Sequence, residues 1–224
     1  MELRVASYNI RKALGTDRRR RPERILSVIR AIDADVVLLQ EADYRLGARR
    51  AALPRSMIER ESDYAVAELA RNDVSLGWHG NAVLVRKGLQ VTATEHFDLP
   101  GLEPRGAVMV TLSGLHVVGT HLGLIRRWRL RQMQAILGHL GPRAENCLIG
   151  GDFNEWSRRI GFEPWADALD LVTPGPSFHS TRPVAWLDRF AHGPRVRVGP
   201  SGVVHHGAAL RASDHLPVWC DAHL

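Results

Sequence analysis

Apolar positions recur with two different periods along this chain, and the alternation between them predicts an α/β protein. Residues 3–10 and 35–40 form short apolar runs typical of buried strands. Between them, four apolar side chains recur at helical spacing: Ile25, Val28, Ile29 and Ile32. Pro22 suits the first turn of that helix, which we expect over residues 22–34. Strand, helix and strand in this order predict a βαβ-like unit.

Short strands dominate the rest of the chain. We expect them at residues 81–86, 91–99, 107–112, 115–121, 147–151, 184–190, 196–198 and 216–222. Ser113-Gly114 lies between two of them and predicts a tight hairpin. Helical spacing returns over residues 125–140, and a short helix is expected near residues 54–60. No internal repeat or linker divides the sequence, so residues 1–224 are expected to form a single domain.

Composition supports a folded chain and says less about its partner. The chain has 224 residues, of which 45% are hydrophobic, enough for a substantial core. Lys and Arg number 30 against 24 Asp and Glu, and this excess is compatible with a phosphate-bearing substrate. Lysine occurs only at Lys12 and Lys87, so a general preference for arginine explains the basic balance equally well.

The N-terminus and the cysteines point to a cytoplasmic location. The first residues lack the apolar core of a secretory signal, and no apolar run is long enough to span a membrane. Cys147 and Cys220 stand in apolar runs and are expected to be buried free thiols, which fits a reducing compartment. No exposed apolar hairpin is evident either, which argues against membrane association.

Acidic, amide and imidazole side chains stand at the ends of several predicted strands. They are Asn9, Glu41, His121, Asp152, Asn154, Asp188, Asp214 and His215. Catalytic groups usually lie in such loops on a rigid sheet. One such residue alone is ordinarily a turn cap. Their recurrence at matching places predicts one shared active site.

In order and spacing, these motifs resemble the endonuclease/exonuclease/phosphatase superfamily over essentially the whole chain. The segments that carry the resemblance are Ser7-Tyr8-Asn9-Ile10, Gln40-Glu41, Thr120-His121-Leu122, Gly151-Asp152-Phe153-Asn154, Leu187-Asp188-Arg189 and Ser213-Asp214-His215-Leu216-Pro217. Arg105-Gly106-Ala107 resembles a further element of bacterial members. The resemblance implies a four-layer α/β (α+β) sandwich, in which two packed mixed β-sheets are flanked by helices.

A divalent metal is the expected cofactor. Carboxylate and amide oxygens are hard ligands that suit Mg²⁺, for which Mn²⁺ can substitute. Glu41 is the best candidate ligand, with Asn9 beside it, and the resemblance implies the same pair. Asp214 is expected to be a second carboxylate facing the metal. The metal would polarise the phosphate as a Lewis acid and stabilise the departing oxygen.

The remaining residues are expected to activate water and stabilise the reacting phosphate. Asp152 and Asn154 lie two residues apart on a segment expected to be extended, which would point both side chains the same way. His215 is expected to act as acid/base or to contact the phosphate, because imidazole titrates near neutral pH. The resemblance implies that Asp188 is its partner and that His121 is a second active-site histidine. Whether His215 or Asp152 deprotonates the water stays open at this point.

The predicted function is a Mg²⁺-dependent phosphoester hydrolase, foremost a nuclease-like phosphodiesterase acting on a phosphate-containing substrate such as a nucleic acid. Arg105 and Arg189 are candidate phosphate contacts, because a guanidinium binds phosphate bidentately. A phospholipid or sphingomyelinase-like phosphodiesterase and a small-metabolite phosphatase fit the same residues. A non-catalytic module that binds nucleic acid or protein is the alternative from another class. Such modules lose their ligands, whereas every aligned position here keeps a competent side chain.

Overall fold

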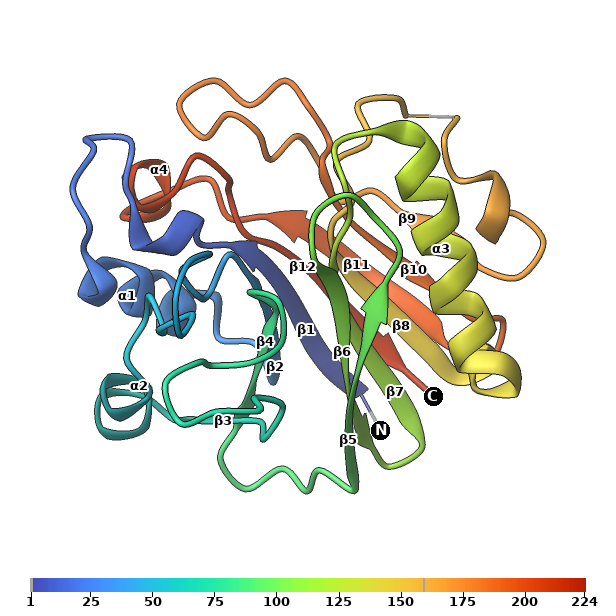
Figure 1. Cartoon of the computed structure of the whole chain (residues 1–224), viewed down its shortest axis with the longest axis horizontal. Coiled ribbons are helices and arrows are strands. Elements are labelled where there is room, and N and C mark those ends of the chain that lie inside the picture. Colours follow the sequence, from blue (N-terminus) through green and yellow to red (C-terminus); the bar gives the residue numbers. More distant parts are fainter. Residues whose placement is uncertain (1, 159) are drawn as a thin grey trace.

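Two six-stranded β-sheets pack face to face in the computed structural model, which describes residues 2–158 and 160–224 (Figure 1). The first sheet has the order β11-β12-β1-β2-β4-β3. Its strands are β1 (Glu2–Asn9), β2 (Val36–Gln40), β3 (Tyr64–Val66), β4 (Ala82–Arg86), β11 (Arg197–Val203) and β12 (Val218–His223). Only β1 and β2 pair in parallel among these described strands, so the sheet is mixed.

The second sheet repeats this plan with the order β5-β6-β7-β8-β10-β9. Its strands are β5 (Ala93–Leu99), β6 (Arg105–Leu112), β7 (Leu115–His121), β8 (Cys147–Asp152), β9 (Asp170–Val172) and β10 (Asp188–His192). Here β7 and β8 form the parallel pair, and the other described neighbours are antiparallel. The hairpin predicted at Ser113-Gly114 joins β6 to β7.

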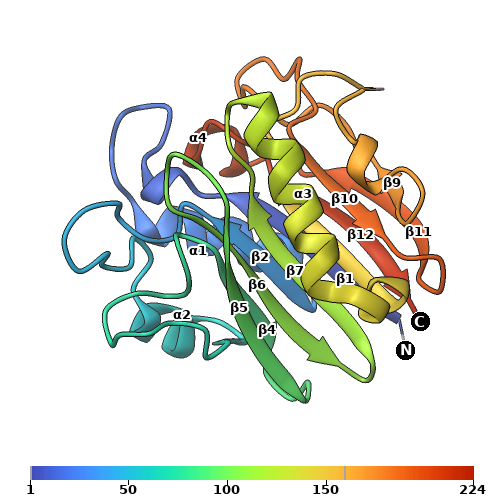
Figure 2. The same cartoon turned by 45° about the vertical axis from the view of Figure 1, so that its right-hand side comes forward.

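Helices cover the outer faces of both sheets. Figure 1 shows α1 (Pro22–Ile32), α2 (Arg55–Glu61) and α4 (Ala209–Ala212) on the side of the first sheet. Figure 2 shows α3 (Arg126–Leu140) lying across the second sheet. Short 3-10 helices occur at η1 (Arg11–Ala13), η2 (Gly141–Asn146) and η3 (Glu163–Trp165). The predicted four-layer sandwich is therefore confirmed.

Strand alternation explains why the central strands read as continuous apolar runs. On β2, Val37 and Leu39 face the layer under α1, whereas Val36 and Leu38 face the layer between the sheets. All four side chains are fully buried. A strand with both faces covered needs apolar residues at every position, and no amphipathic pattern remains. Burial of these side chains is the main favourable term that holds the two sheets together.

The parallel pairs bring the predicted site residues to one end of the sandwich. Asn9 is in register with Gln40, so Glu41 follows directly beside it. His121 is in register with Asp152 in the second sheet, and Asp188 faces Asp152 from the antiparallel neighbour. The site thus forms where both parallel pairs end.

Several element boundaries differ from the sequence predictions. The strand expected at residues 184–190 begins only at Asp188, because residues before it form a loop bridged to Phe178. The first helix ends at Ile32, since Asp33 adopts a left-handed φ of 54°. The short strands β3 and β9 were not predicted.

Two further expectations concern the cysteines and membrane spans. Cys147 and Cys220 are buried free thiols, as predicted. Within the described ranges, no helix combines the length and apolarity needed to cross a bilayer.

Candidate active site

A cavity of about 380 Å³ opens where β1, β2, β7 and β8 end. Eight of the ten predicted site residues line it: Asn9, Glu41, Arg105, His121, Asp152, Asn154, Asp214 and His215. Asp188 lies directly behind His215 and is completely buried. Arg189 is the one predicted residue that the structure directs elsewhere.

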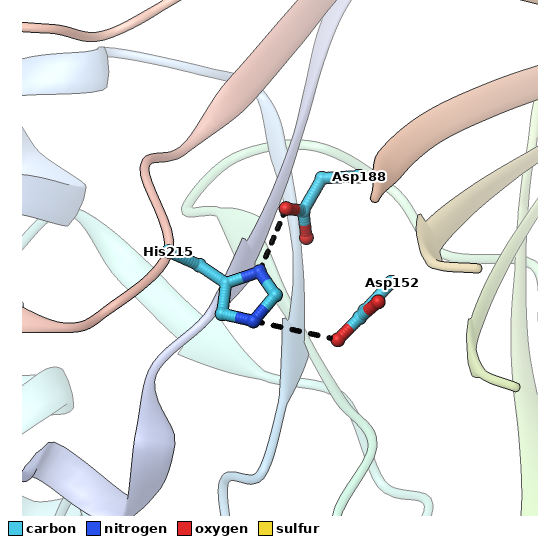
Figure 3. A group of neighbouring side chains, drawn as sticks. All are labelled: Asp152, Asp188 and His215. Atoms are coloured by element: carbon cyan, nitrogen blue, oxygen red, sulfur yellow. Dashed lines mark hydrogen bonds and ion pairs between the residues drawn. The ribbon is translucent and has the colours of Figure 1, made fainter. Parts of the chain in front are cut away.

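His215 lies between two carboxylates, as Figure 3 shows. Its Nδ1 donates to Asp188 Oδ2 at 2.8 Å, and its Nε2 lies 3.6 Å from Asp152 Oδ2. Burial lowers the pKa of His215, but the charges of Asp188 and Asp152 outweigh this effect and raise the pKa to about 10. The ring is therefore an imidazolium at neutral pH, with a positive charge held at the cavity wall.

Asp152 is the carboxylate at the centre of the cluster. Its Oδ2 accepts a hydrogen bond from Asn9 Nδ2 at 3.0 Å and lies 3.3 Å from His121 Nε2. Burial raises the pKa of Asp152 to about 6, while the neighbouring His215 charge and the hydrogen bonds from Asn9 and Asn154 oppose the rise. A carboxylate that titrates near neutrality suits proton acceptance from water.

Close backbone packing fixes the strand that carries Asp152. A Cβ on Gly150 would lie 2.8 Å from side-chain atoms of Leu38 and Phe190. A Cβ on Gly151 would lie 1.9 Å from the carbonyl oxygen of Thr120. Both positions therefore require glycine if β8 is to lie this close to β7 and to the first sheet.

Asn154 reaches the cavity by a different route from the one predicted. The prediction that Asn154 lies on an extended segment is wrong, because Asn154 has a left-handed φ of 52°. Its backbone N–H donates to Asp152 Oδ1 at 3.0 Å, and its side-chain nitrogen donates to Leu122 O at 2.8 Å. The side chains of Asp152 and Asn154 therefore meet because Asp152 closes a turn, and not because alternate residues of a strand point to the same side.

His121 and Arg105 form the wall beside Asp152. Burial, helped by the charge of Arg105, lowers the pKa of His121 well below its ordinary value, so this ring is neutral. Arg105 Nη1 donates to His121 O at 3.4 Å, and its Nη2 donates to Glu103 Oε2 at 3.1 Å. The guanidinium of Arg105 thus lines the cavity while it is held by Glu103 and by the carbonyl of His121.

Arg189 was expected to contact phosphate, but it does not line the cavity. Its guanidinium is fully buried and donates to the backbone oxygens of Trp186, Glu155 and Ser157. It also lies over the ring of Phe162. Because these contacts hold it inside the protein, Arg189 anchors the loop that follows β8 and does not enter the cavity.

Sequence reasoning missed two residues that hold His215. Ser177 Oγ donates to Asp188 Oδ2 at 2.5 Å, the same oxygen that accepts from His215. The Phe178 ring centroid lies 5.0 Å from that of His215 and packs edge-on against Trp156. Both residues belong to an irregular segment, where no periodic pattern marks a contact with a distant residue.

Hard oxygen donors that could hold a divalent metal line the same cavity. The Glu41 carboxylate forms an ion pair with the Lys12 ammonium. Asp214 Oδ2 lies 3.2 Å from Arg11 Nε, and Asn9 Oδ1 accepts from Arg11 N at 3.0 Å. Each oxygen already attracts a cation or an N–H group. This donor set fits Mg²⁺ or Mn²⁺.

A second group of possible metal ligands consists of Asp152, Asp188 and His215, whose ligand atoms lie within 4.8 Å of one another. His215 Nδ1 and Asp188 Oδ2 are already joined by a hydrogen bond within this group. The described residues thus offer two groups of possible metal ligands, this cluster and the oxygens of Glu41, Asp214 and Asn9.

Two packed mixed sheets with a His–Asp pair and a further carboxylate at their strand ends define a class of phosphoester hydrolases. The chain belongs to the Endonuclease/Exonuclease/phosphatase family, whose model matches residues 6–215. Members of this family are hydrolases that use a divalent metal.

Individual relatives are more distant. The chain is 28% identical to the uncharacterized protein YbhP of Escherichia coli (strain K12), with 99% of this chain and 96% of that protein covered. Mannosyl-6-phosphatase Bt3783 of Bacteroides thetaiotaomicron VPI-5482 has a TM-score of 0.75 at 17% identity, covering 99% of this chain and 100% of its own. TDP2 of D. rerio, complexed with a single-strand DNA product, has a TM-score of 0.72 at 18% identity, covering 100% and 99%. At these identities the two solved structures support the fold alone.

Proposed function

We propose that the protein is a Mg²⁺-dependent phosphodiester hydrolase in which Asp152 deprotonates the attacking water. The observation that carries the proposal is the environment of Asp152 Oδ2, which faces His215, His121 and Asn9 at the cavity wall. Its pKa of about 6 leaves it ionised at neutral pH and still basic enough to accept a proton.

His215 has a different task in this mechanism. Because the charges of Asp188 and Asp152 raise its pKa, His215 enters the proposed reaction as an imidazolium, and the water's proton goes to Asp152 instead. Its charge instead stabilises the negative charge that develops on the phosphoryl oxygens. Asp188 holds the ring in this orientation through Nδ1, and Ser177 holds Asp188. The geometry thus favours Asp152 as the general base.

Other residues of the cavity are proposed to bind the phosphate and the metal. Glu41 and Asn9 would hold Mg²⁺ or Mn²⁺, with Asp214 beside them. The bound metal supplies Lewis-acid stabilisation of the phosphate and of the leaving oxygen. Arg105 contributes a further positive charge to the phosphoryl group, and Asn154 is held at the same wall by Leu122 O.

A nuclease-like phosphodiesterase is the leading form of this function. The excess of Lys and Arg over Asp and Glu is compatible with a polyanion, and one structural neighbour is bound to a single-strand DNA product. A phosphatase of small phosphorylated metabolites is the second candidate. The modest volume of the cavity, about 380 Å³, favours it, and another neighbour is a mannosyl-6-phosphatase.

Hydrolysis of bis(p-nitrophenyl) phosphate with Mg²⁺ or Mn²⁺ tests the proposal. We expect turnover that disappears on chelation and in Asp152→Asn. A second panel compares single-stranded DNA, RNA, sphingomyelin and sugar phosphates to rank the substrates. If the purified protein cleaves none of these esters in the presence of either metal, the proposal is overturned.

A further inference from the structure

A second cavity of about 290 Å³ adjoins the catalytic one, and Glu41 lines both. Five residues line both cavities, so the two spaces are continuous: Lys12, Glu41, Arg45, Arg105 and His121. Tyr44, Arg49 and His79 line only the second cavity. We call this space the Arg45 cavity.

Two guanidinium groups in the Arg45 cavity have no carboxylate partner. Arg45 is exposed and makes no hydrogen bond or ion pair with the residues of ranges 2–158 and 160–224. Arg49 Nη1 donates to His79 Nδ1, and His79 Nε2 donates to Asp98 Oδ1 at 3.0 Å. His79 uses both ring nitrogens as a neutral imidazole, so Arg49 has no hydrogen bond or ion pair with a carboxylate, and only the buried Asp43 among the described acids interacts electrostatically with it.

The acids of the cavity are engaged elsewhere. Glu41 pairs with Lys12, and Glu103 pairs with Arg105. Asp43 is buried, and its Oδ1 accepts the backbone N–H of Leu76 at 2.7 Å. The cavity therefore presents the positive charge of two arginines beside the catalytic site, where burial of an anion would be favourable.

An arginine-rich composition alone does not account for this arrangement. Some surface arginines pair with an acid: Arg55 with Glu68, Arg86 with Asp33 and Arg126 with Glu163. Arg50 has no acidic partner among the described residues either, but it does not line the cavity, whereas Arg45 and Arg49 lack such a partner and face a concave space.

We propose that the Arg45 cavity binds a second phosphate of the substrate, next to the phosphate that is cleaved. This inference rests on the proposed hydrolase function and adds its substrate class, a phosphoester that carries another phosphate nearby. Arg45 and Arg49 would bind that phosphate through paired N–H···O contacts, the geometry in which guanidinium groups match phosphate oxygens. The neighbouring phosphate of an oligonucleotide and the second phosphate of a small metabolite share this chemistry.

The test uses two chromogenic substrates that differ only in the second phosphate. They are the p-nitrophenyl phosphate ester of thymidine and the same ester with a phosphate on the other sugar hydroxyl. We expect the wild type to show a kcat/KM about 10- to 100-fold higher for the second ester, as charge-assisted hydrogen bonds to phosphate imply. Arg45→Ala and Arg49→Ala should remove most of this preference. Equal preference in wild type and variants overturns the inference while leaving the hydrolase function intact.

Arg50→Ala is the matched control. Arg50 is exposed on the same loop and does not line the cavity, so its loss removes the same charge without removing a contact. We expect its preference to match that of the wild type. A loss of preference in Arg50→Ala equal to that in Arg49→Ala would overturn the inference, because general electrostatic attraction would then explain the effect.

Calorimetric binding separates this inference from a failure of the hydrolase function. Thymidine bisphosphate is titrated into the wild type and into Arg49→Ala, and we expect weaker binding to the variant by the same factor as in the kinetics. Inorganic pyrophosphate distinguishes the two possible sources of the second phosphate, an oligonucleotide and a small phosphorylated metabolite. Binding of both ligands through Arg49 indicates that phosphate alone is recognised, whereas binding of thymidine bisphosphate alone indicates a nucleotide. If neither ligand distinguishes the wild type from the variant, the Arg45 cavity does not bind a second phosphate.

Discussion

Asp152 Oδ2 lies 3.6 Å from His215 Nε2, and the two residues come from different sheets. Asp152 is the last residue of β8 in the second sheet, whereas His215 precedes β12 of the first sheet. Their approach therefore depends on the packing of one sheet on the other, through the apolar layer that contains Leu38 and Phe190. The proposed chemistry is sensitive to any shift between the two sheets.

Replacing the proposed base should remove activity without unfolding the protein. We expect Asp152→Asn to lower kcat for bis(p-nitrophenyl) phosphate by about 10²- to 10⁴-fold, because the amide cannot accept the water's proton. Asp170→Asn serves as the control, since Asp170 is an exposed aspartate on β9 of the same sheet. Thermal unfolding should show both variants folded. Substantial turnover by Asp152→Asn would show that another group deprotonates the water.

The pH profile should have two limbs with opposite signs. Asp152 must be ionised to accept a proton, so kcat/KM should rise as pH increases through about 6, the pKa of this group. His215 must be protonated to stabilise the phosphoryl oxygens, so kcat/KM should fall as pH approaches about 10. The measurement is kcat/KM against pH at a fixed concentration of free metal. A profile that is flat across the acid limb would contradict the role of Asp152.

Ser177 is proposed to be a positioning residue that acts through Asp188. We expect Ser177→Ala to lower kcat about 10-fold, because the Asp188 carboxylate loses one of the hydrogen bonds that orient it. Without the Ser177 hydrogen bond, the negative charge of Asp188 stabilises the His215 imidazolium more strongly and raises the pKa of His215 further. The alkaline limb of the pH profile should therefore move to higher pH. Ser201→Ala on β11 removes an exposed hydroxyl and should change neither quantity. An unchanged alkaline limb in Ser177→Ala would limit Ser177 to packing.

Metal dependence should be traced to Glu41. Removal of divalent cations with EDTA is expected to abolish hydrolysis, and addition of Mg²⁺ or Mn²⁺ should restore it. Glu41→Gln removes a negative charge from the proposed ligand set, so the concentration of Mg²⁺ needed for half-maximal activity should rise at least tenfold. Glu59→Gln on α2 is an exposed control. If Glu41→Gln requires no more Mg²⁺ than the wild type, Glu41 is not a ligand.

Arg189 should matter for stability more than for phosphate binding. We expect Arg189→Ala to lower the free energy of unfolding by about 3 kcal/mol, because buried carbonyls of Trp186, Glu155 and Ser157 lose their donor. Lysine at this position should not rescue the loss, since one ammonium cannot reproduce the planar fork. Urea unfolding compares both variants with Arg30→Ala, an exposed control on α1. Wild-type stability in Arg189→Ala would contradict the anchoring role.

The sequence predicts the centre of this fold well for a physical reason. Strands such as β2 are buried on both faces and therefore read as continuous apolar runs, and polar residues directly after them stand out. Glu41 and Asp152 were found in this way, and the structure brings both to one cavity. The shortest strands, β3 and β9, have three residues each, too few to show a period.

Side-chain direction is the part that sequence patterns could not supply. Arg189 and Arg105 both adjoin site motifs, yet one points into the protein and the other lines the cavity. Ser177 and Arg45 lie in irregular segments, where a contact depends on tertiary packing and has no signature along the chain. Asn154 was expected at the site, but its left-handed backbone was not.

Gly150 and Gly151 leave β8 with no space for a side chain on the approach to Asp152. The position of the proposed base is therefore fixed by backbone packing, and substitutions in that strand are expected to damage the whole protein. The loops around the cavity face no such limit. The second cavity is lined from loops by Tyr44, Arg45, Arg49, Glu103 and Pro104. Side chains there can change while the proposed base stays in place, so we expect relatives to diverge in the esters they accept.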